Sequence, residues 1–110
     1  MNFYIGDSIE EINEQDYNIE FSDDLINYIY LIRNNVTCDM SKLYQINPYS
    51  DVEVSQNDLP QLIAICRYIL DTEMLKNYDE SNEGIHMVED LLDIAQNALS
   101  RNLRLISIGD

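Results

Sequence analysis

The chain has 110 residues, of which 21 are Asp or Glu and only six are Lys or Arg, so its formal net charge is −15. This length favours a single domain, residues 1–110, and a hydrophobic content of 45% suffices for a packed core, which argues against wholesale disorder. Nucleic acids and anionic membrane surfaces both select clustered Lys and Arg, so this composition excludes them as direct partners.

The N-terminal part of the chain predicts a strand or an extended N-terminal arm, then an acidic connection and a second strand. Residues 3–6 are an apolar run ending in glycine, and residues 7–16 are acidic enough to form only a polar helical turn or a loop. Tyr17, Ile19 and Phe21 alternate with polar residues, which is the period of a half-buried strand. No basic region precedes a long apolar run, and no apolar stretch approaches about 18 residues, so a cytoplasmic location is expected.

The next segment predicts a helix, a turn and an edge strand. Ser22 is typical of a helix N-cap, and the apolar residues that follow are spaced for a helix over residues 23–33. Residues 47–50, Asn-Pro-Tyr-Ser, have the composition of a turn. Residues 51–55 alternate again, and their outward acids favour a position at the edge of a sheet.

The C-terminal half predicts two long helices and a closing strand. Asn57 or Asp58 is expected to cap a helix over residues 59–74, which carries a continuous apolar stripe. A second helix is predicted over residues 82–102 and a strand over residues 103–108. The expected fold class is therefore α+β, with three amphipathic helices packed with a small, mainly antiparallel sheet.

The residue types that catalysis and metal binding need are isolated in this sequence. His86 is the only histidine, and Cys38 and Cys66 have no metal-ligand spacing. A negative field also works against a cysteine nucleophile. A calcium loop beginning at Asp79, with Gly84 at its turn, departs from the required pattern at three positions, so a solvated acidic linker is the preferred interpretation. We therefore predict no enzyme, no cofactor and no metal site.

Eight tyrosines without a tryptophan are a second notable feature of the composition. Tyrosine supplies contact area at low entropic cost and is enriched at the energetic centres of interfaces. About half of these rings are expected to lie at the edge of the core with their hydroxyls in water. Tyr78, within the acidic break before the last helix, is the ring predicted to anchor a partner.

Residues 43–52, Leu-Tyr-Gln-Ile-Asn-Pro-Tyr-Ser-Asp-Val, and the helix after them resemble the middle of small bacterial immunity proteins. These belong to contact-dependent growth inhibition and related polymorphic toxin systems, where a similar Ile-Asp-Pro-Tyr-Gly-Asp turn leads through a short strand into a helix. The present chain has Asn47 and Ser50 where that pattern has Asp and Gly. The motif is a structural turn, so the resemblance implies a cognate toxin as partner but assigns no binding residues.

Charge and resemblance together predict an immunity protein that binds and neutralises a cognate basic toxin domain, a nuclease, by occluding its active site or binding at an exosite. Two alternatives stay open: an acidic nucleic-acid mimic that inhibits a DNA-binding defence complex, and a small non-enzymatic adaptor whose charge serves solubility. The predicted partner-binding residues are acids near the N-terminus and in the later acidic break, with one tyrosine: Asp7, Glu10, Glu11, Glu14, Tyr78, Asp79, Glu80 and Glu83.

Overall fold

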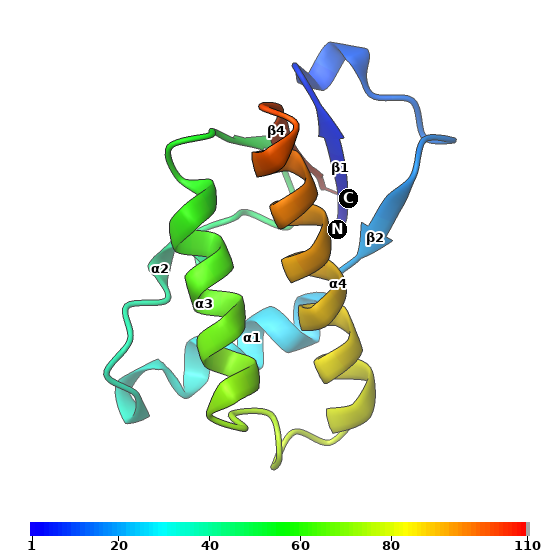
Figure 1. Ribbon diagram of the computed structural model, residues 1–110. Helices are drawn as coiled ribbons and strands as arrows, with labels where there is room; N and C mark the ends of the chain where they lie inside the picture. The colour runs from blue at the N-terminus through cyan, green and yellow to red at the C-terminus, as the bar shows by residue number, and fades with distance from the viewer. Residues whose placement is uncertain (110) are drawn as a thin grey trace.

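The computed structural model, which describes residues 1–109, contains a four-stranded antiparallel sheet (Figure 1). The strands lie in the order β2-β1-β4-β3, so the two central strands are far apart in sequence. Tyr4 of β1 stands opposite Ile106 of β4. All four predicted strands are confirmed; their bounds are β1 (Asn2–Gly6), β2 (Asn18–Glu20), β3 (Val52–Val54) and β4 (Arg104–Ile108).

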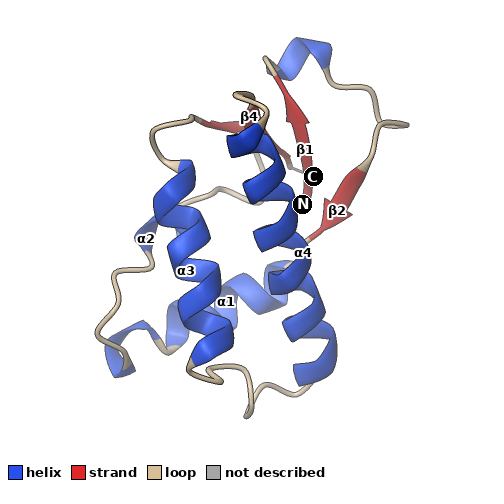
Figure 2. Ribbon diagram, viewed as in Figure 1, coloured by secondary structure: helices blue, strands red, loops and turns tan. Residues whose placement is uncertain are grey.

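Helices cover one face of this sheet (Figure 2). The longest helix, α4, lies against β1, β2 and β4, and α3 packs alongside it. This arrangement confirms the α+β class, with three amphipathic helices and a small antiparallel sheet. The helices are α1 (Asp23–Leu31), α2 (Ser41–Tyr44), α3 (Leu59–Asp71) and α4 (Ser81–Ser100), with 3-10 turns η1 (Ile9–Glu11) and η2 (Arg33–Asn35).

The main core lies between the sheet and the helices. Phe3, Ile19 and Leu105 point to the helical face, because residues paired across neighbouring strands share a face. The ring of Phe3 meets that of Phe21 edge-on, with 6.3 Å between ring centroids. Each such fully buried side chain contributes about 1.5–3 kcal/mol, so these four residues are a substantial part of the stability.

The opposite face of the sheet is also covered, by the connection between β1 and β2. Tyr4 and Ile106 point to this face, yet they are only 5% and 0% exposed. A Cβ atom at Gly6 would lie 3.0 Å from the Cδ1 of Ile12 and 3.4 Å from the Cδ1 of Ile106. Residues 7–17 therefore hold an apolar side chain over the sheet, and we call this segment the strap.

The two caps predicted from sequence have different outcomes. The Oγ of Ser22 accepts a hydrogen bond from the backbone N–H of Leu25 at 3.2 Å, so the cap of α1 is confirmed. Asp58 occupies the predicted N-cap position of α3, so the position is confirmed, but its side chain makes no capping bond, so the side-chain cap is wrong. The carboxylate of Asp58 instead pairs with the ammonium of Lys42 at 3.3 Å, and this pair links α2 to the start of α3.

Both long helices are followed by a residue in the left-handed conformation. Glu73 has φ of 55° and Asn102 has φ of 57°. Beyond them, the N–H of Met74 donates to the carbonyl of Ile69 at 3.2 Å, and the N–H of Leu103 donates to that of Ala98 at 3.0 Å. These bonds satisfy carbonyls that the helix end leaves unpaired, and they reverse the chain sharply.

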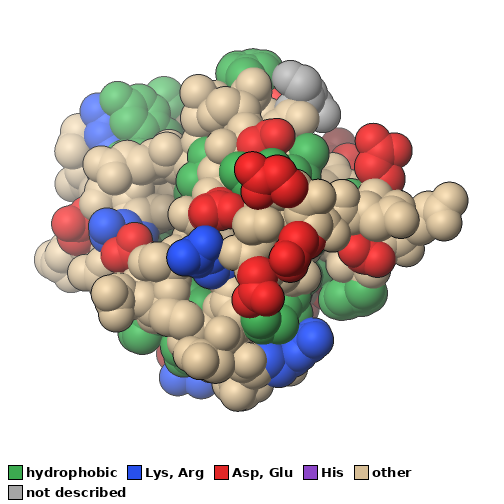
Figure 3. Space-filling view, turned by 90° about the horizontal axis from the view of Figure 1, so that it is seen from above, with side chains coloured by type: hydrophobic (Ala, Val, Ile, Leu, Met, Phe, Trp, Pro, Cys, Tyr) green, Lys and Arg blue, Asp and Glu red, His purple; other side chains and the backbone are tan. Residues whose placement is uncertain are grey.

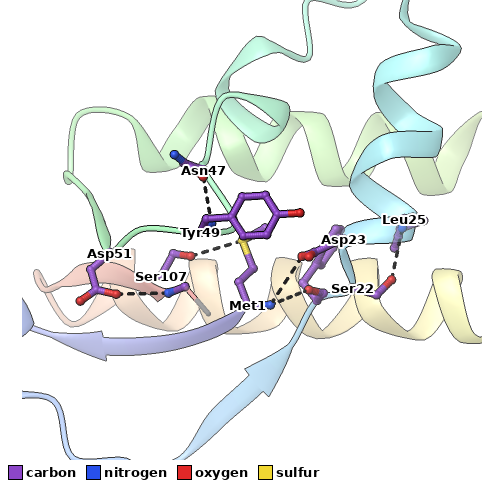
Figure 4. A network of polar contacts seen from close by, with 10 residues as sticks. Met1, Ser22, Asp23, Leu25, Asn47, Tyr49, Asp51 and Ser107 are labelled. Atoms are coloured by element: carbon purple, nitrogen blue, oxygen red, sulfur yellow. Dashed lines mark hydrogen bonds and ion pairs between the residues drawn. The ribbon is translucent and has the colours of Figure 1, made fainter.

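The Asn-Pro-Tyr-Ser segment forms the predicted turn and is fastened to the end of β4 (Figure 4). The Oδ1 of Asn47 accepts a hydrogen bond from the N–H of Tyr49 at 2.9 Å. The N–H of Gly109 donates to the Oδ1 of Asp51 at 3.2 Å. A Cβ atom at Gly109 would lie only 2.5 Å from the backbone nitrogen of Ser50, so the two backbones touch directly.

The amino group of Met1 is buried beside the end of β2 (Figure 4). It donates to the carbonyl of Phe21 at 3.2 Å and lies 4.0 Å from the Oδ1 of Asp23. The sulfur of Met1 accepts a hydrogen bond from the hydroxyl of Ser107 at 3.3 Å. These contacts tie β1 to the start of α1 and to β4.

Candidate functional site

The first group of predicted site residues lies on the strap. Glu53 and Arg104 hold the strap at the edge of the sheet. The Nη1 of Arg104 lies 3.4 Å from the Oε1 of Glu53. The N–H of Ile9 donates to the Glu53 carboxylate at 2.9 Å, and Arg104 donates to a strap carbonyl at 2.9 Å. Because the backbone is anchored while the side chains reach outward, the strap exposes all four predicted acids: Asp7, Glu10, Glu11 and Glu14.

The view from above looks onto the end of the molecule that carries η1 (Figure 3). Several acidic side chains lie close together on this face, with basic side chains beside them. One of the basic residues near the strap is Arg104, which already pairs with Glu53. The strap end is therefore acidic but locally mixed in charge.

The second predicted group surrounds the start of α4. The ring of Tyr78 is half-buried and lies 4.9 Å from the ring of Tyr28, centroid to centroid. A Cβ at Gly84 would lie 3.1 Å from the Tyr78 ring. Tyr78 thus fills the junction of the α3–α4 connection with α1 and α4, whereas the sequence predicted a ring available to a partner.

The carboxylates around Tyr78 influence one another. Burial raises the pKa of Tyr78, and the charges of Asp24, Glu80 and Asp79 raise it further against a hydrogen bond with Ser22 that lowers it. A hydrogen bond with Glu83 and the charge of Glu83 raise the pKa of Glu80. Asp24, at the start of α1, thus joins the second group, a proximity that no local sequence pattern indicates.

The two predicted groups do not form one surface. In Figure 1, η1 lies near the C-terminal end of α4, whereas the α3–α4 connection lies at its N-terminal end. The 20 residues of α4 span roughly 30 Å at about 1.5 Å per residue. A single small partner domain would have to extend along α4 to touch both groups.

A row of acids on the outer face of α4 connects the two ends, and of its members only Glu83 was predicted as a site residue. Glu83, Asp90 and Asp93 are exposed and recur at near-helical spacing. His86 lies in the same row, with its Nδ1 3.5 Å from a carboxylate oxygen of Glu89. Helical spacing in the sequence is the signal that identifies this row.

A second unpredicted feature is an exposed ring beside β2. Tyr17 is 66% exposed, although the sequence predicted it on the buried face of a strand. The strap closes in a turn immediately before it, where the N–H of Asp16 donates to the carbonyl of Asn13 at 2.8 Å, so β2 begins only at Asn18. Three exposed acids lie within three residues of Tyr17 in the sequence: Glu14, Asp16 and Glu20.

Few of the carboxylates are neutralised within the molecule. Among residues 1–109, only Asp23, Glu53 and Asp58 have an oxygen within 4.0 Å of a Lys, Arg or N-terminal nitrogen. The guanidinium of Arg33 lies instead over the ring of Tyr30, 3.7 Å from its centroid. The surplus of negative charge is therefore directed at solvent and at any partner.

The described part of the chain contains no group of three or more His, Cys, Asp or Glu side chains that could hold a metal ion. The calcium-loop pattern that begins at Asp79 does not form a loop, because α4 starts at Ser81 and places Gly84 inside the helix. Burial raises the pKa of the Cys66 thiol to about 12, which removes its thiolate.

Comparisons with known proteins return no match to a family model, to a curated protein or to a solved structure. Within residues 1–109, no helix combines the length and the apolar character needed to cross a membrane.

Proposed function

We propose that this protein is an immunity protein that binds a cognate basic toxin domain, a nuclease, and neutralises it by occluding its active site. The observation that carries the proposal is the unneutralised acid surface: a net charge of −15, with only three carboxylates near a Lys, Arg or N-terminal nitrogen in residues 1–109. A nuclease needs a positive cleft for its substrate, and exposed carboxylates can compete there with phosphates.

Electrostatics explain why such a surface suits a rapid inhibitor. Uncompensated charge disfavours the compact state through self-repulsion, and a cationic partner relieves that repulsion on binding. Complementary fields also raise association rates, up to about 10⁸–10⁹ M⁻¹s⁻¹ at low salt, and suppress partners of the wrong charge. The exposed ring of Tyr17 beside Glu14, Asp16 and Glu20 adds an aromatic contact to this field.

The nucleic-acid mimic receives less support from the arrangement of the acids. Mimicry calls for two rows of carboxylates at phosphate-like spacing, as the two strands of a duplex present. The α4 face offers one row, which His86 interrupts, and the remaining predicted acids lie at opposite ends of the helix.

The first step of the test is to search the neighbouring reading frames for one that encodes a basic C-terminal domain, and the second is to co-express the chain with that domain. We expect protection of the cells and copurification of the two proteins, with binding that weakens as salt screens exposed charges. A chain that neither protects cells nor copurifies with that domain at low salt contradicts the proposal.

Three double charge reversals are compared to locate the interface. Each changes the net charge by the same amount, so a difference in binding between them reports the position of the reversed charges. They act on the strap (Glu10→Lys with Glu11→Lys), on the α3–α4 connection (Asp79→Lys with Glu80→Lys) and on the α4 face (Glu89→Lys with Asp90→Lys). The pair at the interface is expected to weaken binding by at least about tenfold more than the other two pairs. Equal effects of all three would show that only overall charge matters.

A further inference from the structure

The edge of the sheet formed by β2 has backbone N–H and C=O groups that no neighbouring strand pairs with. The N–H of Phe21 donates to the carbonyl of Met1 at 2.9 Å, and the nitrogen of Met1 donates to the carbonyl of Phe21 at 3.2 Å. Along an antiparallel pair of strands, residue pairs that exchange backbone hydrogen bonds alternate with residue pairs that do not. Asn2 opposite Glu20, and Tyr4 opposite Asn18, are therefore non-bonded pairs.

The alternation directs the N–H and C=O groups of Asn18 and Glu20 away from β1. Within residues 1–109, neither backbone group of these two residues makes a hydrogen bond to a loop or cap. β2 therefore presents up to four unpaired backbone groups to solvent, and an extended segment of another chain pairs with such an edge.

The other edge of the sheet is obstructed. β3 is also short, and its only strand residue with outward backbone groups is Glu53. Lys42, Gln45 and Ile46, from α2 and the turn after it, lie beside this strand and line a hollow there, together with Asp58, whose carboxylate is 3.3 Å from the Lys42 ammonium. The two edges thus differ, and only the β2 edge is open for strand addition.

The surroundings of the β2 edge select a cationic strand. Glu14, Asp16 and Glu20 are exposed beside the edge, and Tyr17 is 66% exposed next to it. Glu14 also lines a hollow of about 360 Å³, shared with Asn18, on the face that the strap partly covers. A Lys or Arg side chain on an added strand could extend over Asn18 toward the Glu14 carboxylate.

A second copy of the chain does not suit this edge. Two β2 strands side by side would bring Asp16 and Glu20 of both copies together, and each copy carries a net charge of −15. Like charges directly opposite in a sheet are destabilising.

From the open edge and its acids, we infer that the basic partner adds an extended, cationic strand to β2, with Tyr17 packing against it. This inference rests on the proposed function, since the occupant is the toxin domain that the protein neutralises. It names the place and mode of binding, which the acid surface alone does not.

The test uses a synthetic strand peptide, acetyl-Lys-Val-Lys-Val-Lys-Val-Lys-amide, and the ¹⁵N-labelled full chain at low salt. The peptide is expected to slow hydrogen exchange of the Asn18 and Glu20 amides and to shift the Tyr17 ring signals. A control peptide with the same charge but N-methylated at all seven residues has no backbone N–H to donate along either edge. It is expected to bind at least about tenfold more weakly.

Matched variants separate pairing from charge. Glu20→Pro removes an outward N–H without touching the β1 ladder and is expected to weaken binding several-fold more than Glu20→Gln, which removes the same charge. Asp71→Asn removes one charge, as Glu20→Gln does, from the exposed C-terminal end of α3 and is expected to leave peptide binding unchanged.

Three results would overturn strand addition: equal binding of both peptides, perturbation confined to the α4 acids, or no binding by either peptide. The peptide comparison uses the unmodified protein, so it stands even if Glu20→Pro fails to fold. Each of these results leaves the co-expression test untouched. Protection of cells without pairing at β2 keeps the immunity function, whereas pairing at β2 without protection removes that function and leaves a site for cationic strands.

Discussion

At Gly109, a single methyl group would meet three backbone atoms of the Asn-Pro-Tyr-Ser turn. The Cβ of Gly109→Ala would lie 2.5 Å from the nitrogen of Ser50, 2.7 Å from its oxygen and 2.8 Å from the oxygen of Pro48. Backbone cannot move aside as a side chain does, so we expect a loss of about 1–3 kcal/mol in the free energy of unfolding. Urea denaturation measures this loss.

Gly6→Ala is the matched control for that substitution. Its Cβ would approach most closely the ends of flexible side chains, the Cδ1 atoms of Ile12 and Ile106 at 3.0 and 3.4 Å, and its nearest backbone atom, the oxygen of Ser8, is at an ordinary contact distance of 3.9 Å. A smaller loss of stability is therefore expected. If both variants lost the same amount, the direct contact of Gly109 with the turn would not be what the glycine provides.

The two cysteines should differ in reactivity in the folded protein. Cys66 is 0% exposed, and burial raises its pKa to about 12, so it holds almost no thiolate at neutral pH. Cys38 is half-buried in the connection before α2. Mass spectrometry after brief treatment with iodoacetamide is expected to find a single label, on Cys38, and a second label only after unfolding. Rapid labelling of Cys66 under native conditions would contradict the packing of α3.

At the scale of the elements, the end of α3 carries strain that a substitution can remove. Glu73 has φ of 55°, a conformation that costs a residue with a Cβ about 1–2 kcal/mol. Glu73→Gly and Glu73→Ala both remove the negative charge, but only glycine relieves the strain. Glu73→Gly is expected to be more stable than Glu73→Ala by about 1 kcal/mol, as measured by thermal or urea unfolding. Equal stabilities would mean that residue 73 is not held in the left-handed conformation.

Local patterns in the sequence predicted most of the elements, because each depends on near neighbours. The alternation at Ile19 and Phe21 and the N-cap at Ser22 are both confirmed. Two predictions were wrong: that Tyr17 lies on the buried face of a strand, and that the side chain of Asp58 caps α3. In both cases a contact outside the local pattern decides the structure. The end of β2 depends on a turn within the strap, and the Asp58 carboxylate is diverted to Lys42 of another helix. Such competing contacts are not visible in a local pattern.

At the scale of the whole molecule, charge repulsion should make stability depend on pH. The hydrogen bond with Glu83 and its charge raise the pKa of Glu80 above its ordinary value. The folded state therefore binds the proton of the Glu80 carboxyl group more tightly than the unfolded chain does. The stability that comes from protonated Glu80 is present at low pH and is lost as pH rises through the raised pKa. We expect Glu80→Gln to raise the melting temperature at neutral pH and to reduce the difference between neutral and mildly acidic buffer.

Asp93→Asn is the control for this pH dependence, because it removes the same charge from the outer face of α4, away from the pair. It is expected to change the melting temperature less and to leave the pH dependence as it is in the unmodified chain. Glu80→Gln with an unchanged pH dependence would show that the Glu80–Glu83 pair does not control it.

The candidate site could be predicted only in part, and the limit is geometric. Composition was enough to expect exposed carboxylates, since buried charges are costly, and every predicted acid is exposed. Whether Glu10 and Glu80 share a surface depends on the direction of α4 and on which strands it covers. The free edge at Asn18 and Glu20 depends on the strand order β2-β1-β4-β3, which sequence patterns do not specify.

That strand order also decides when the protein becomes functional during synthesis. The central ladder joins Asn2–Gly6 to Arg104–Ile108, so a ribosome must translate and release residues beyond position 100 before it can form. Until then the helices of the nascent chain lack the sheet against which they pack, and β2 lacks a completed sheet behind it. The complete sheet, and with it the proposed inhibitory activity, should therefore appear in one late step, and incomplete chains should contribute none.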